Sequence, residues 1–328
     1  MSKGKKIAIT LLLLAICLPQ GALPGTRQNT IDSLRQLIPQ RTGTEKTELL
    51  NLLSRQFWQI APDSSLKYAS QALDHAQQIN NPTSISDACN RVGNAYYFLG
   101  DTTQALEYYH RSLKIRKELN DADRLFQIYN NLGVYYINNG QPDRALENYR
   151  KAYQVSLDAN LAENIASSLS ALASYYEQTN DYEKAIEYYL KSVEKSKSDQ
   201  DTVQMADTYI DLGRIHRNIS SYDKALRYYL QAIRFLKQGS DKATLANAYN
   251  ETGIIHMTMD DYDKSLEYYQ QALKLFEQLG QTDMVAMVYN NIGIIHDDQG
   301  NNEQALEYYQ KSLESDKKAN DINGMASS

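Results

Sequence analysis

Apolar and polar positions repeat along the chain with a period of 40 residues, and each period contains two amphipathic stripes. In the first complete period, apolar or small residues stand at positions 89, 92, 93 and 96, the spacing of a helix packed on one side. Gly100-Asp101 then forms a turn, and a second stripe with the same spacing runs from Ala105 to Leu113. The pattern therefore predicts two helices per period.

Three positions of the period are almost constant, and a fixed period of about 20 to 50 residues is the signature of a solenoid. The small residues belong where paired helices cross, because a larger side chain would push the axes beyond about 8–10 Å. We therefore expect an all-α, right-handed α-solenoid of antiparallel helix pairs. The first helix carries Gly93, Gly133, Ala173, Gly213, Gly253 and Gly293; the second carries Ala105, Ala145, Ala185, Ala225, Ser265 and Ala305, then Tyr109, Tyr149, Tyr189, Tyr229, Tyr269 and Tyr309.

The pattern of Gly93, Tyr96, Ala105 and Tyr109 resembles that of the tetratricopeptide repeat family. The period of 40 exceeds the family's usual repeat of about 34 residues, and Lys117 replaces its proline near the end of the second helix. This longer type is similar to the repeats of kinesin light chains, polarity adaptors and bacterial sensor proteins. The resemblance implies a groove lined by the first helices that receives an extended peptide.

The register of the pattern divides the chain into five parts. Residues 83–320 form six repeats of 40 residues, and residues 45–82 form a degenerate capping repeat with Leu53 at the glycine position. Residues 25–44 are a short linker or helix, and residues 1–24 are a signal peptide. Residues 321–328 begin a further unit, because Asn320-Asp321 repeats the turn signal and Met325 is in register with earlier first helices.

The signal-peptide prediction rests on Lys3, Lys5 and Lys6, which precede an apolar run over residues 7–18 that is too short to span a bilayer. It places the mature protein in the periplasm, or on the outer face of the inner membrane, of a bacterium. Membrane contact would then require an uncleaved signal or a segment after residue 328. Cys17 loosely resembles a lipidation site, but Ile16 is large for the preceding position.

Charge and motif content argue against several classes of function. The net charge is −6, and there is no basic face, so we expect no nucleic-acid partner. The chain has no phosphate-binding Gly-Lys-Ser/Thr loop, no His-Glu-x-x-His, no Cys-x-x-Cys and no Gly-x-Ser-x-Gly. We therefore expect no catalytic residues, no metal and no cofactor.

Isolated residues of chemical interest have structural interpretations. His216, His256 and His296 are 40 residues apart, so they cannot converge on one ion, and we expect them to pack on their partner helices. Cys89 is interpreted as a small buried apolar residue, and Trp58 as a packing residue of the capping repeat.

Helical projection gives candidate binding residues in the groove. One row, which we call the asparagine row, consists of Asn90, Asn130, Ser170, Ile210, Asn250 and Asn290. Its amides either pair with the backbone of a bound peptide or hold the stack in register. Arg214 and Arg217 either clamp an anion or are neutralised, Arg217 by Glu177. Exposure of Phe98 or Met257 would indicate a protein-binding patch. The predicted groove residues are Asn90, Asn94, Tyr97, Asn130, Arg214, Arg217, Asn250 and Asn290.

Three functions fit these observations. The leading hypothesis is a non-enzymatic exported scaffold that binds a protein or peptide segment in its groove. The alternative is the sensory region of a membrane histidine kinase or helix-turn-helix regulator whose output part follows residue 328. The third is an assembly scaffold that makes contacts through Tyr108, Tyr188, Tyr228 and Tyr268 on the convex face.

Overall fold

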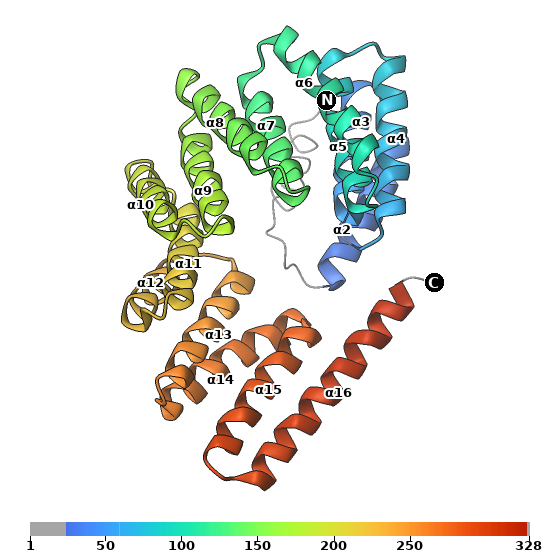
Figure 1. Ribbon diagram of the computed structural model, residues 1–328. Coiled ribbons are helices and arrows are strands. Elements are labelled where there is room, and N and C mark those ends of the chain that lie inside the picture. Colours follow the sequence, from blue (N-terminus) through green and yellow to red (C-terminus); the bar gives the residue numbers. More distant parts are fainter. Residues whose placement is uncertain (1–23, 59, 327–328) are drawn as a thin grey trace. The chain divides into compact units, whose positions relative to one another are not determined.

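The computed structural model describes residues 24–58 and 60–326, and these residues form α-helices joined by short turns, without any β-strand (Figure 1). The helices belong to two compact units, one of residues 25–195 and one that contains residues 196–328. Each unit consists of successive helix pairs, which confirms the predicted all-α solenoid. No described helix is long and apolar enough to cross a membrane. The predicted signal peptide lies outside the described residues, apart from Pro24.

The unit of residues 25–195 begins with α2 and a short 3-10 helix, η1, and continues with four helix pairs. The α3–α4 pair is the degenerate repeat, in which Leu53 is fully buried at the glycine position. The N-terminal elements are α2 (Pro24–Leu37), η1 (Ile38–Gln40), α3 (Gly43–Phe57) and α4 (Pro62–Gln78). The complete pairs are α5 (Pro82–Phe98) with α6 (Thr102–Leu119), α7 (Ala122–Asn138) with α8 (Pro142–Asp158), and α9 (Ala162–Gln178) with α10 (Tyr182–Ser198).

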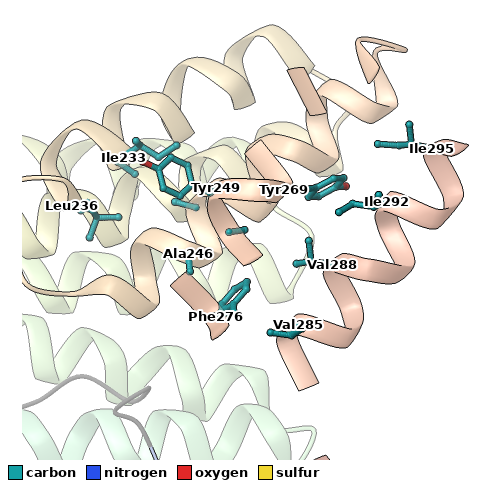
Figure 2. Close-up of a cluster of buried hydrophobic side chains, with 14 residues drawn as sticks. Ile233, Leu236, Ala246, Tyr249, Tyr269, Phe276, Val285, Val288, Ile292 and Ile295 are labelled. Atoms are coloured by element: carbon teal, nitrogen blue, oxygen red, sulfur yellow. The ribbon is translucent and has the colours of Figure 1, made fainter. Parts of the chain in front are cut away.

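The unit of residues 196–328 contains three further pairs around a continuous apolar core. Figure 2 shows this core, in which Ile233 of α12, Tyr249 of α13, Phe276 of α14 and Val288 of α15 point into one cluster. Each pair thus buries its apolar stripe on the next pair. The pairs are α11 (Thr202–Asn218) with α12 (Tyr222–Leu236), α13 (Lys242–Thr258) with α14 (Tyr262–Leu279), and α15 (Thr282–Asp298) with α16 (Asn302–Ala326).

The turns between helices are made by a residue in the left-handed conformation, followed in many cases by an aspartate that caps the next helix. At the end of α5, the Gly100 N–H donates to the Tyr97 carbonyl and the Asp101 N–H to the Tyr96 carbonyl, which is a Schellman motif. The Asp101 carboxylate then accepts from the Gln104 N–H of α6. Left-handed residues recur at Asn80, Gly100, Asn120, Gly140, Asn160, Asn180, Gln200, Ser220, Asp260, Gly280 and Gly300.

In five of the six complete pairs, a glycine on the first helix lies directly against the tyrosine ring of the second helix. A Cβ atom on Gly133 would lie 2.5 Å from Cε1 of Tyr149, and one on Gly213 would lie 2.7 Å from Cε1 of Tyr229. Tyr149 and Tyr229 are buried, so the ring has little room to move. The α9–α10 pair has Ala173, also fully buried, in this place. The predicted packing role of the small residues and tyrosines is confirmed.

The C-terminal end differs from the sequence prediction. The turn signal at Asn320-Asp321 predicts a break and a new first helix, whereas α16 continues as one helix to Ala326. Asparagine and aspartate permit a turn without enforcing one. In the earlier repeats the turn is also favoured by the following helix, which buries its apolar stripe.

We predict that Gly133→Ala destabilises the protein by about 1 kcal/mol or more, because overpacking against Tyr149 outweighs the gain in helix propensity. In a Tyr149→Leu background the same change should stabilise by about 0.5–1 kcal/mol, since only the propensity gain remains. Urea unfolding followed by circular dichroism measures both effects. An equal effect of Gly133→Ala in the two backgrounds would contradict the contact account.

Candidate functional site

A hollow of about 170 Å³ lies on the first-helix side of the unit of residues 25–195. We call it the Trp58 pocket. It draws on the end of α3, on α5 and α7, and on one side chain from α6. Its lining residues are Trp58, Asn94, Tyr97, Phe98, Tyr109, Asn131, Val134 and Tyr135.

One wall of the Trp58 pocket is aromatic and exposed. The Trp58 and Phe98 ring centroids are 5.6 Å apart, and Tyr97 packs its ring edge-on against Phe98 at 5.5 Å. Phe98 remains 39% exposed and Val134 42% exposed. Large apolar side chains left in contact with water beside a hollow are typical of a protein-binding surface. Phe98 is thus exposed, which is the condition that the sequence analysis set for a protein-binding patch at this residue.

The other wall carries amides that connect neighbouring first helices. Nδ2 of Asn131 on α7 donates to Oδ1 of Asn90 at 2.8 Å, and more weakly to Oδ1 of Asn94 at 3.4 Å. The buried Tyr109 hydroxyl donates to Oδ1 of Asn94 at 2.8 Å. Without this hydrogen bond the hydroxyl would be a buried polar group with no partner. Each primary amide has two donor hydrogens and an acceptor oxygen, so this network leaves capacity for a bound backbone.

The asparagine row does not form one exposed surface. Asn250 is only 3% exposed, and the Oδ1 atoms of Asn130 and Asn250 are buried without a hydrogen-bond partner. Ile210, in the same row, packs against Ala225 and Ile255, which shows that this position faces the neighbouring helices. Of the row, Asn90 takes part in the amide network beside the Trp58 pocket and Asn290 of α15 is exposed.

The two predicted groove arginines are paired with acids. Nη1 of Arg217 lies 2.5 Å from Oε2 of Glu251 on α13, and the same carboxylate oxygen accepts from the Tyr229 hydroxyl at 3.1 Å. Arg214 pairs with Asp211 on its own helix at 2.7 Å. Arg217 is thus neutralised by Glu251, where the sequence predicted Glu177. The structure favours neutralisation over an open anion clamp at Arg217.

The second apolar residue considered for a patch, Met257, is partly buried against the core of its unit. Its sulfur accepts a hydrogen bond from the Tyr269 hydroxyl at 3.8 Å. Met257 therefore gives no argument for a binding patch, in contrast to Phe98.

The three histidines pack on tyrosines of their partner helices, as the sequence predicts. His216 stacks on Tyr228 with ring centroids 5.3 Å apart, and His256 stacks on Tyr268 at 5.4 Å. His296 makes the same contact with Tyr308. Burial lowers the pKa of His216 and of His256 below the ordinary histidine value. In the described part of the chain, no group of three potential ligands is placed to hold a metal ion.

Cys89 is fully buried in the core shared by α3, α4 and α5, and burial raises the pKa of its thiol to about 11. A thiol that is buried and protonated is unreactive, which confirms its structural interpretation.

The tetratricopeptide repeat model matches residues 84–158, 124–198, 164–238 and 244–318. The chain belongs to the tetratricopeptide repeat family. These matches cover the complete helix pairs and begin two residues after the start of α5. The α3–α4 pair lies before them, consistent with its degenerate sequence. A search of curated protein sequences found no match.

Several solved structures share the fold at low sequence identity. The apo form of RapI is 19% identical, with a TM-score of 0.58, covering 84% of this chain and 99% of its own. A Rap protein complexed with Competence and Sporulation Factor is 15% identical, with a TM-score of 0.59 and coverage of 89% and 80%. BtubC from P. vanneervenii is 22% identical, with a TM-score of 0.59 and coverage of 67% and 92%. At these identities the likeness concerns the fold alone.

Sequence reasoning missed part of the pocket. Trp58 was assigned to packing, and Asn131 and Tyr135 were not projected into a groove, whereas the position of Val134 was. The repeated Tyr-Asn-Asn string at Tyr129 contained a usable signal, because its second asparagine is the one that bonds to Asn90. No pattern in the sequence indicated that Trp58 lines the pocket, because its contact with Phe98 joins two different repeats.

We predict that acidification destabilises this protein partly through His216. Its lowered folded-state pKa means that the unfolded chain binds more protons near pH 6, so stability falls as the pH decreases past about 6.5. His216→Tyr, which copies the residue found at Tyr176, should reduce the loss of thermal stability between about pH 7.5 and pH 5.5.

The reciprocal variant, Tyr176→His, should steepen that pH dependence. Melting temperatures of the two variants and the wild type at both pH values provide the measurement. Identical pH profiles in all three proteins would contradict the prediction.

Proposed function

We propose that this tetratricopeptide repeat protein is a non-enzymatic scaffold that binds an extended segment of a protein partner across α5 and α7. The exposed apolar wall of the Trp58 pocket carries the proposal: Phe98 and Val134 remain in contact with water while Trp58 lies against Phe98. An apolar side chain of the partner would cover these groups and bury their surface.

The amides beside the pocket suit an extended backbone. Asn90 and Asn131 are joined by one hydrogen bond and are half-buried, so a peptide reaches them without disrupting the core. Amide side chains pair with peptide N–H and C=O groups regardless of sequence, whereas the apolar pocket selects a side chain. The site thus combines general backbone recognition with one selective contact.

The ion-paired surface of α11 and α13 is less suited to this task. Opening the Arg217–Glu251 pair would leave both charges and the Tyr229 hydroxyl in need of partners. A Rap protein of similar fold is known in complex with Competence and Sporulation Factor, so a ligand is compatible with this kind of helical array.

We also propose that the scaffold is exported. The support is the sequence alone: three lysines before a short apolar run. The sensory alternative rests on the resemblance to bacterial sensor proteins and on the sequence register after Asn320-Asp321, a position through which α16 runs without a break. No structural observation favours that alternative, so the exported scaffold is the function that we put forward.

Trp58 is the single tryptophan of the chain, so its fluorescence reports directly on the pocket. We predict that peptides selected on the full chain from a tryptophan-free random library shift the Trp58 emission on binding. Phe98→Ala should weaken their affinity by about tenfold or more, as for an aromatic anchor in an interface.

Leu190→Ala is the matched control, because Leu190 is 43% exposed on the second helix α10, away from the pocket residues. It should leave the affinity unchanged. Selected peptides that bind equally well to the Phe98→Ala protein and leave Trp58 emission unaltered would refute the proposed site.

A further inference from the structure

Two arginines near the Trp58 pocket make no direct ion pair within the described part of the chain, although the charge of Asp87 acts on one of them, Arg91. Arg55 of α3 holds its guanidinium carbon 6.0 Å from the centre of the Trp58 ring. Arg91 of α5 occupies the position that Asn131 occupies one repeat later, on the same side as the pocket. Both side chains are half-buried, and neither makes an ion pair with any carboxylate that the structure describes.

The carboxylate whose charge acts on Arg91, that of Asp87, forms its ion pairs with two other arginines. It accepts from Arg124 Nε at 3.0 Å and also from the fully buried Arg116. Arg116 bonds in addition to Asp121, at 2.7 Å, and to the Thr83 carbonyl, at 2.9 Å. This network joins α5, α6 and the start of α7, so Asp87 could turn towards Arg91 only by giving up its ion pairs with Arg124 and with the buried Arg116.

The local electrostatics therefore favour an added anion. Burial, followed by repulsion from the charge of Arg55, lowers the pKa of Arg91 to about 10 although the charge of Asp87 opposes the shift, so the charged form of Arg91 is disfavoured where it lies. A carboxylate from outside would relieve this repulsion and accept hydrogen bonds from a guanidinium, whose planar fork matches its two oxygens.

We infer that Arg55 and Arg91 form a carboxylate-binding subsite next to the Trp58 pocket, so that the partner segment presents an acidic group beside its apolar side chain. This inference rests on the proposed function. Trp58 contacts both Arg55 and Phe98, at 6.0 and 5.6 Å, so the anionic and apolar groups belong to the same or neighbouring residues of the ligand. The carboxylate comes either from an aspartate or glutamate side chain or from a chain terminus.

The test uses two tryptophan-free random peptide libraries, one with free C-termini and one with both ends flanked, selected on the full chain. We expect an acidic group next to a large apolar residue in the enriched peptides. Enrichment of internal acids in both libraries identifies a side chain as the source, whereas a preference confined to the free C-terminus identifies the terminal carboxylate.

The affinity of one enriched peptide is then compared with that of its amide analogue, in which the carboxylate becomes a carboxamide. The amide should bind the wild type about ten- to a hundredfold more weakly, the worth of a charge-assisted hydrogen bond. Arg55→Gln and Arg91→Gln should each reduce that ratio, and the double variant should abolish it. Arg111→Gln, at an exposed site on α6, should leave it intact, and circular dichroism verifies folding.

Different results would contradict the carboxylate-binding subsite and the proposed function. Peptides that shift Trp58 emission without any acidic preference, or with equal affinity for acid and amide, would overturn the anion subsite and leave the proposed function standing. Peptides that bind without any dependence on Phe98 or effect on Trp58 would overturn both.

Discussion

The contact between a small residue on each first helix and a tyrosine ring on the second sets the geometry on which the rest of the structure depends. Where Gly133 meets Tyr149, one added carbon atom would approach the ring to 2.5 Å. The tyrosine ring packed between the two backbones therefore sets the distance between the helices of a pair. Because the contact recurs every 40 residues, successive first helices have similar surroundings, and side chains such as Asn90 and Asn131 come within hydrogen-bond distance.

The same contact links the core to the surface that we assign to binding. The Tyr109 ring packs where Gly93 leaves room, and its hydroxyl emerges to donate to Asn94 in the wall of the pocket. Burial raises the pKa of Tyr109 above its ordinary value, so the hydroxyl stays protonated and remains a donor. A residue that holds the helix pair together thus also orients an amide that lines the proposed binding pocket.

The helix pairs could be predicted from the sequence because each pair repeats the same stripe and turn, and Gly100 and Asp101 perform the roles that their chemistry indicates. The direction in which each helix face points could not be predicted from the sequence. Asn250 was projected into a groove, but it is buried against its neighbours, and a periodic pattern does not specify how far each helix is rotated about its own axis. Trp58 was missed because its neighbour Phe98 belongs to the next repeat, and the α16 helix was missed because turn residues permit a break that packing must enforce.

The crystal structure of the full chain with one selected peptide would test the central claim most directly. The account predicts the peptide backbone extended across α5 and α7 near Asn131, with an apolar side chain against Trp58 and Phe98. A peptide bound to the second helices, or along α11 to α15 with the Trp58 pocket empty, would contradict it.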